Sequence, residues 1–239
     1  MKTFTLTAVI VAMLIVFPNT SVAKPDPEQG KSMGSMSVAE LEKAADEARA
    51  QKDYRLAIDY FDAALKKEPK NAVLYNKRGM ATLKNGDMPS ARADFQRAIK
   101  LNSKYAEALN NLGAVDFSQK NLGSAAKYFK KAVALEETRA TFHVNLGAAW
   151  FGQNKLERAI AEYTRALELD PDVLNNTVKT GVAAQIATPE ERARYSYMLA
   201  KIYAKRGNVD ECLRCLKKAK EVRAARPEKN SNSNRSGTA

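Results

Sequence analysis

The feature that most constrains this chain is an internal repeat of 34 residues. The segment HVNLGAAWFGQNKLERAIAEYTRALELDP, which begins at His143, nearly restates LNNLGAVDFSQKNLGSAAKYFKKAVALEE, which begins at Leu109. A fixed period of about 20–50 residues indicates an array of small units that stack and bury a shared core. We therefore expect an elongated array of similar units.

Rows of 34 residues that start at Val38, Ala72, Ala106 and Ala140 align several columns of the sequence. The aligned columns are a glycine (Gly79, Gly113, Gly147), an alanine (Ala57, Ala91, Ala125, Ala159), an aromatic residue (Phe61, Phe95, Phe129, Tyr163) and a second alanine (Ala64, Ala98, Ala132, Ala166). The spacing i, i+4 and i+7 puts both alanines and the aromatic residue on one helix face. Small residues on that face allow a second helix to approach closely, so each row is expected to form a helical hairpin.

These rows resemble tetratricopeptide repeats, with the Leu-Gly, Ala, Phe and Ala columns of that family matched best in the second to fourth rows. A fifth row at 193–226 follows an insert at 174–192, in which Thr188, Pro189 and Glu191 indicate a helix start. The resemblance implies an all-α, right-handed superhelical solenoid of about five helical hairpins. The array would cover residues 38–226, as rows 38–71, 72–105, 106–139, 140–173 and 193–226.

The N-terminal segment resembles a secretory leader. Lys2 precedes an apolar stretch over residues 4–17, Pro18 ends it, and Ser21 and Ala23 offer small residues for cleavage. We interpret residues 1–23 as a signal peptide cleaved after Ala23, which predicts a periplasmic or secreted protein. An uncleaved membrane anchor is the alternative.

The segments outside the array differ in composition from the repeats. Residues 24–37 and 227–239 are rich in Pro, Gly, Ser and Asn. We expect a flexible linker and a disordered tail, respectively.

The resemblance further implies a concave groove lined by the first helix of each repeat, and such curved faces commonly bind extended partners. In related arrays, asparagines in the column of Lys77, Asn111 and Asn145 bind a peptide backbone; the alternative is that they hydrogen-bond the backbone of the neighbouring repeat. A second column contains Leu83, Phe117 and Phe151, which either form an apolar stripe in the groove or are buried between repeats. The predicted groove residues are Asn76, Lys77, Met80, Leu83, Asn110, Asn111, Phe117, Asn145 and Phe151.

Charge is concentrated at the C-terminal end of the array. The chain has a formal net charge of +12, and the last row alone contains ten Lys and Arg residues against three Asp and Glu residues. This basic surface is either a solvated end or a dock for an anionic envelope surface. Nucleic acid is a poor candidate for an exported protein, and exposed repeat ends are compatible with a homo-oligomer. The basic residues of the final helix are Arg214, Lys217, Lys218, Lys220 and Arg223.

The two cysteines and the single histidine are the remaining chemical candidates. Cys212 and Cys215 have a C-x-x-C spacing, which fits two packed small residues, a disulfide or, least well, a redox pair. His143 is expected to pack in the core, and no catalytic set can be assembled around it. We therefore expect no enzyme activity, cofactor or metal site. The sequence predicts an exported scaffold that binds an extended peptide or protein partner, with an envelope-surface docking module as the alternative.

Overall fold

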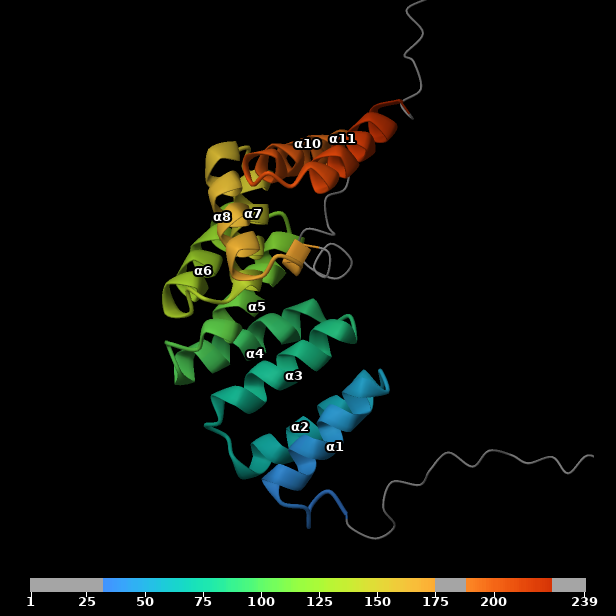
Figure 1. The fold of residues 1–239 in the computed structure, drawn as a ribbon. Helices are drawn as coiled ribbons and strands as arrows, with labels where there is room; N and C mark the ends of the chain where they lie inside the picture. The colour runs from blue at the N-terminus through green and yellow to red at the C-terminus, as the bar shows by residue number, and fades with distance from the viewer. Residues whose placement is uncertain (1–31, 175–187, 225–239) are drawn as a thin grey trace, which may run out of the picture.

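The computed structural model describes residues 32–174 and 188–224, and within these ranges the chain forms ten α-helices and no β-strand. The helices are α1 (Val38–Ala50), α2 (Tyr54–Lys67), α3 (Ala72–Lys84), α4 (Met88–Leu101), α5 (Ala106–Ser118), α6 (Leu122–Leu135), α7 (Ala140–Gly152), α8 (Leu156–Leu169), α10 (Pro189–Lys205) and α11 (Val209–Ala224). They form five hairpins, each made of a first and a second helix, and Figure 1 shows these hairpins stacked in chain order into a curved array. The all-α solenoid predicted from the repeat is confirmed.

Capping side chains explain where two of the first helices begin. Ser37 and Glu40 form a capping box at α1, in which each side chain accepts a hydrogen bond from the other residue's backbone N–H. Thr188 and Glu191 form the same arrangement at α10, with Pro189 as the first helical residue. The helix start predicted from this motif is therefore confirmed.

The aromatic column supplies the largest side chains of the core. Phe61, Phe95, Phe129 and Tyr163 are all fully buried. A Cβ atom on Gly113 would lie 2.8 Å from the Phe129 ring, which is closer than two carbon atoms normally approach. The ring therefore rests directly on the backbone of the first helix, and the glycine column exists to leave room for it.

The second helix of each hairpin packs against the first helix of the next, so the buried residues form clusters that extend across hairpin boundaries. One cluster of buried residues extends from Phe117 to Cys215 and spans the last three hairpins. Within it, the Tyr195 ring of α10 lies edge-on to Tyr163 and to Phe151, with centroids 5.5 Å apart in each pair. Edge-to-face pairs of this kind contribute about 0.5–1.5 kcal/mol each beyond the area they bury. These contacts dock the last hairpin onto α7 and α8 across the sequence insert.

The segment just before α1 differs from its prediction as a flexible linker. Residues 32–37 form a turn against the first hairpin, where the backbone carbonyl of Gly34 accepts a 2.9 Å hydrogen bond from Lys67 Nζ. Met33 and Met36 also pack against the core of that hairpin. Removing these two apolar side chains from water favours the ordered turn.

Several predictions concern parts of the chain that lie outside the described residues. These are the signal peptide over 1–23, linker residues 24–31, insert residues 175–187 and the C-terminal tail 227–239. None of the helices in the described ranges combines the length and hydrophobicity that a bilayer-spanning segment requires.

Candidate partner-binding groove

The first helices of successive hairpins are connected by a regular series of polar side-chain contacts. Lys77 Nζ of α3 donates to Glu42 of α1 at 2.6 Å, and Asn111 Nδ2 of α5 donates to Asn76 of α3 at 2.9 Å. The same repeat positions meet again between Asn145 of α7 and Asn110 of α5, at 2.8 Å. These three pairs join residues 35 apart in sequence, so they link each first helix to the one before it. The row of first helices presents the face on which the groove was predicted.

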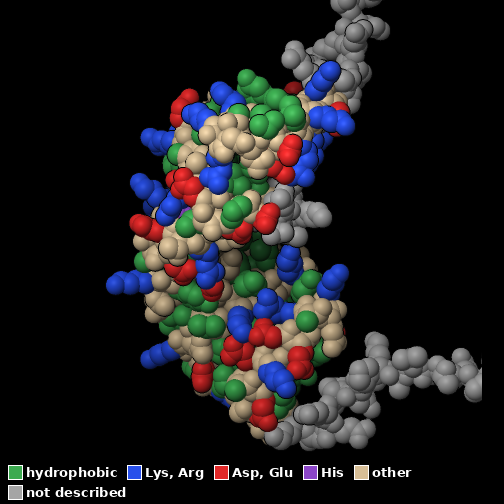
Figure 2. Space-filling view, in the orientation of Figure 1, with side chains coloured by type: hydrophobic (Ala, Val, Ile, Leu, Met, Phe, Trp, Pro, Cys, Tyr) green, Lys and Arg blue, Asp and Glu red, His purple; other side chains and the backbone are tan. Residues whose placement is uncertain are grey.

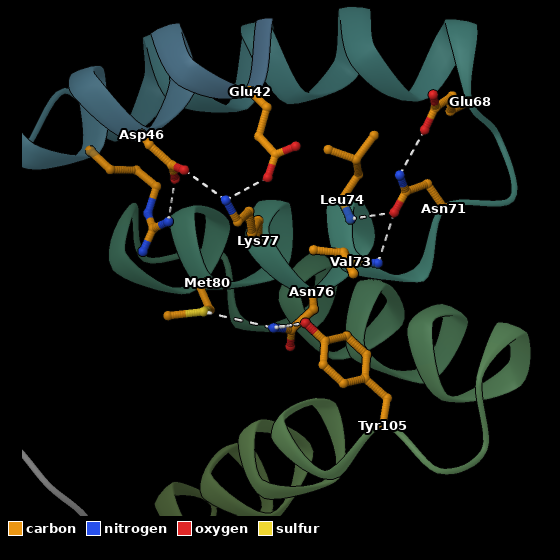
Figure 3. Close-up of polar contacts among 11 residues, drawn as sticks. Glu42, Asp46, Glu68, Asn71, Val73, Leu74, Asn76, Lys77, Met80 and Tyr105 are labelled. Carbon is orange, nitrogen blue, oxygen red and sulfur yellow. Dashed lines mark hydrogen bonds and ion pairs between the residues drawn. The ribbon is translucent and has the colours of Figure 1, made fainter. Parts of the chain in front are cut away.

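Asn76 is buried within this series and cannot serve as an open groove residue. Its Oδ1 accepts the bond from Asn111, and its Nδ2 donates to the Tyr105 hydroxyl at 3.3 Å and lies 4.0 Å from Met80 Sδ. Figure 3 shows the Asn76 amide between Met80 Sδ and the Tyr105 hydroxyl. Asn76 was predicted to contact a partner; the structure assigns it to the contact between repeats.

Lys77 is also held by the protein itself. Its Nζ lies 2.6 Å from both Glu42 and Asp46 of α1, as Figure 3 shows. Burial alone would lower the pKa of Lys77, but the hydrogen bonds to Asp46 and Glu42 outweigh it and raise the pKa above its ordinary value. Lys77 therefore remains charged and paired at neutral pH, and the structure places this predicted groove residue in a contact between repeats.

Asn110, Asn111 and Asn145 are half-buried and keep part of their hydrogen-bonding capacity. In the contacts among the described residues, Asn111 and Asn145 each use one amide N–H, and their carbonyl oxygens have no partner. An asparagine amide offers two donors and one acceptor group, so each retains one donor and one acceptor. That combination matches a peptide unit. The asparagines bond the neighbouring repeat, as the alternative stated, but through side chains and without exhausting their amides.

Two apolar side chains are exposed on the same face of α3. Val73 and Met80 have 44% and 36% of their surface accessible, and they are spaced i and i+7 with Asn76 and Lys77 between them. Met80 was predicted from the sequence. Val73 was missed, although its spacing from Met80 places both on one helix face. In Figure 2, hydrophobic, basic and acidic side chains are mixed along a hollowed flank of the array.

The predicted apolar stripe of Leu83, Phe117 and Phe151 does not face an open groove. Phe117 and Phe151 are only 5% and 6% exposed and belong to the core shared by the last three hairpins. Leu83 is half-buried and packs against the core formed by α4 and α5. Stacking hairpins buries this column because it lies where consecutive repeats meet. The alternative interpretation, burial between repeats, is the correct one.

Partly buried ion pairs make up a second set of polar residues, which sequence reasoning did not find. Arg78 of α3 bonds Asp94 of α4 and Asp62 of α2, both at 2.5 Å, and the bond to Asp94 raises the pKa of Arg78. Asp116 of α5 is buried and accepts hydrogen bonds from Arg92 and, at 2.5 Å, from Ser124.

The signal for these pairs was available in the sequence. Arg78 occupies the repeat column of Leu112 and Leu146, and Asp116 occupies the column of Thr82 and Trp150. A charged residue in a buried column requires a partner, because an unpaired buried charge is costly. Both pairs connect elements within the array and leave the groove face free.

His143 is buried as expected, but it has polar partners as well as packing contacts. Its Nδ1 lies 2.7 Å from Glu162 Oε2 and its Nε2 lies 3.0 Å from the Glu137 carbonyl oxygen. These contacts tie α7 to α8 and to the preceding turn. Within the described part of the chain, no group of three or more His, Cys, Asp or Glu residues is placed to hold a metal ion.

Both cysteines of α11 are free thiols in the structure, so the disulfide given as one alternative is absent there. Cys215 is buried against α10, and Cys212 is half-buried. Burial raises the pKa of Cys215, and the nearby Glu211 adds to the effect, so the thiol form is favoured. This environment suits a packed small residue better than a redox nucleophile.

The basic residues of α11 lie apart from the groove face, at the C-terminal end of the array. Lys217, Lys218 and Lys220 are exposed, whereas Arg214 forms an ion pair with Glu211 one turn earlier. The side chain of Arg223 lies outside the described residues. Figure 2 shows basic side chains gathered at the α10–α11 end.

Comparison with protein families identifies the fold. Models of the tetratricopeptide repeat match residues 42–106, 76–139, 140–173 and 193–226. The chain belongs to the tetratricopeptide repeat family. The fold of this family provides a scaffold for protein–protein interaction, which agrees with a site built from side-chain amides and exposed apolar groups.

Solved tetratricopeptide repeat structures share this architecture at low sequence identity. MamA is 21% identical, with a TM-score of 0.55 over 78% of this chain and 92% of that chain. YrrB, described as a TPR protein with an unusual peptide-binding site, is 18% identical, with a TM-score of 0.53 over 79% and 88%. A thermophilic TPR protein from Thermus thermophilus is 20% identical, with a TM-score of 0.53 over 79% and 93%. At this identity the likeness shows the fold alone. A comparison with curated proteins finds no match.

Proposed function

We propose that this protein is an exported scaffold that holds an extended segment of a partner protein against the first helices α3, α5 and α7. The observation that carries the proposal is the combination of spare amide groups on Asn111 and Asn145 with exposed Val73 and Met80 beside them. Backbone-directed amides and apolar contacts together suit an extended peptide with some hydrophobic side chains.

The contacts between repeats strengthen this interpretation because they fix the asparagine side chains in place. Asn111 is held by Asn76, and Asn145 by Asn110, so each amide is oriented before a partner arrives. A preorganised group loses less conformational entropy on binding than a freely rotating one. YrrB, a TPR protein with an unusual peptide-binding site, gives independent support that this fold accommodates such a ligand.

A library of random peptides selected on the purified protein tests the proposal. Selected peptides should bind through their backbone, and the double variant Asn111→Ala/Asn145→Ala should weaken them. Each lost hydrogen bond contributes about 0.5–1.5 kcal/mol, so the loss should be about fivefold to a hundredfold in Kd.

Two further variants separate binding from folding. Met80→Glu places a charge on the groove face and should also weaken binding, while the amide pairs between repeats remain. Gln96→Ala, on the exposed side of α4, is the matched control and should leave Kd unchanged. Unchanged affinity in both groove variants, with helicity preserved, would contradict the proposal.

Export rests on the leader-like segment over residues 1–23. N-terminal sequencing of the protein purified from its host should begin at Lys24. Retention of Met1 would instead support the membrane-anchored alternative.

A further inference from the structure

The C-terminal end of the array has an exposed apolar face. Val209, Leu213 and Leu216 have 63%, 59% and 39% of their surface accessible, and together they account for three of the seven exposed large hydrophobic residues in the described ranges. Their spacing of i, i+4 and i+7 places them on one face of α11. Single exposed apolar residues are ordinary on protein surfaces, but a contiguous stripe usually marks an interaction site.

The inner repeats show what normally covers this face. Leu216 occupies the aromatic column, whose other members Phe61, Phe95, Phe129 and Tyr163 are fully buried. Tyr163, for example, is covered by Tyr195 from the first helix of the next hairpin.

The other two residues of the stripe also have inner counterparts that meet the following first helix. Leu122 stands in the column of Val209 and lies against Gly152 of α7. Arg92 stands in the column of Leu213 and is paired with Asp116 of α5. The stripe on α11 is therefore a repeat-stacking surface without a following helix among the described residues.

Residues 225–239, which follow α11, are not suited to cover this surface. Residues 225–239 contain no Val, Ile, Leu, Met, Phe, Tyr or Trp. Covering an apolar stripe requires apolar side chains, because the gain comes from apolar area removed from water.

The charges around the stripe distinguish between a partner protein and a second copy of this chain as its occupant. Lys217 and Lys220 are exposed beside the C-terminal half of the stripe, so an occupant with acidic residues along that edge is favoured. A second α11 would set lysine against lysine. The α1 helix of a second copy has Glu40 and Glu47 where inner first helices have buried apolar residues, so stacking would bury charges.

We infer that the face of α11 formed by Val209, Leu213 and Leu216 binds an acidic amphipathic helix of a partner protein. The helix would sit where the first helix of a following repeat sits in the inner hairpins. Its apolar residues, spaced i, i+3 or i+4 and i+7, contact the stripe, and its Asp and Glu residues face Lys217 and Lys220. This site is separate from the groove and goes beyond the proposed function.

A helical peptide taken from the array itself provides a defined probe. The probe is a stapled peptide of the α5 sequence, Ala106–Ser118, with the substitutions Asn110→Glu, Asn111→Glu and Ser118→Glu. A twin peptide has Lys at the same three positions. Fluorescence anisotropy with the purified protein should show that the acidic peptide binds at least about tenfold more tightly than the twin.

Variants of the protein locate the site. Leu213→Glu should weaken the acidic peptide by at least about tenfold, while Leu135→Glu, at an exposed leucine of α6, should leave it unchanged. The groove variant Asn111→Ala/Asn145→Ala should also leave it unchanged, which separates this inference from the proposed function. Because Leu213 is already largely exposed, its replacement should preserve helicity by circular dichroism.

Five outcomes would overturn the inference. Failure of the acidic peptide to bind at about 1 mM would show that this face binds no such helix. Equal binding of both peptides would show that the face has no preference for acidic residues. Unchanged binding of the acidic peptide to the Leu213→Glu variant would place its binding site elsewhere on the protein. Sedimentation showing self-association lost in Leu213→Glu would assign the face to a second copy. Loss of binding to phosphatidylglycerol vesicles in the same variant would assign it to a membrane surface.

Discussion

The two ends of this array present opposite surfaces. At the N-terminal end, α1 has exposed Glu40 and Glu47 in columns where inner first helices have buried residues such as Leu74 and Val115. At the C-terminal end, α11 has exposed apolar residues in columns that a following hairpin contacts in the inner repeats. The comparison teaches that burial in a solenoid depends on position in the stack as much as on residue type.

The difference has a simple physical origin. An inner hairpin has a neighbour on each side, so both of its stacking faces leave water. A terminal hairpin has one neighbour, and its outer face stays solvated unless the residues there are changed. Stacking another helix on α1 would bury charged residues and is unfavourable. Stacking a helix on the apolar stripe of α11 would remove apolar area from water and is favourable.

The largest difference in the free energy of unfolding should be between alanine substitutions in the aromatic column at the middle of the array and at its end. Phe129 is fully buried, and Phe129→Ala should lower the free energy of unfolding by about 3–5 kcal/mol through lost burial and a cavity. Leu216, in the same column of α11, is partly exposed, and Leu216→Ala should cost under about 2 kcal/mol. Urea denaturation of both variants measures the difference. Equal losses of unfolding free energy in the two variants would contradict the claim that the end of the array is less buried than its interior.

An intermediate effect is expected from adding a methyl group to two glycines of the third hairpin. A Cβ atom on Gly113 would lie 2.8 Å from the Phe129 ring and 3.3 Å from the Ala125 carbonyl oxygen, whereas a Cβ on Gly123 would meet nothing within 4 Å. Overpacking costs about 1–3 kcal/mol, and Gly-to-Ala in a helix returns up to about 1 kcal/mol. Gly113→Ala should therefore destabilise the protein, and Gly123→Ala should stabilise it, as followed by thermal unfolding. A stabilised Gly113→Ala protein would show that the ring can move aside.

The smallest effect should come from Tyr163→Phe at the interface with the last hairpin. The hydroxyls of Tyr163 and Tyr195 are buried and have no hydrogen-bond partner among the described residues. Removing one unsatisfied hydroxyl should leave the free energy of unfolding unchanged or raise it by about 1 kcal/mol. Chemical denaturation compares the variant with the parent. A clear loss of stability would indicate that the hydroxyl has a partner after all.

Much of the fold could be predicted from the repeat alone. The rows begin at Val38, Ala72, Ala106 and Ala140, and α1, α3, α5 and α7 begin at those residues. Local chemistry explains this success, because helix periodicity, capping residues and glycines act over a few neighbouring positions. The capping box at Thr188 was readable for the same reason.

The candidate groove was harder to predict because its residues depend on contacts between repeats. Lys77 is held by Glu42 and Asp46, and Asn76 by Asn111 and Tyr105, and no local pattern reveals such partners. Phe117 was ambiguous because its column lies where hairpins meet. Met80 was predicted as a groove residue and is exposed, but its neighbour Val73 was missed.

The sequence by itself determined the unit: a helical hairpin whose glycine, alanine and aromatic columns satisfy packing within one repeat. Those requirements are met by residues close together in the chain, so they leave a periodic signature. The tertiary structure alone decided which polar groups are used up between repeats, which amides remain available, and which apolar face has no cover. These properties depend on distances between residues in different repeats, and stacking sets those distances.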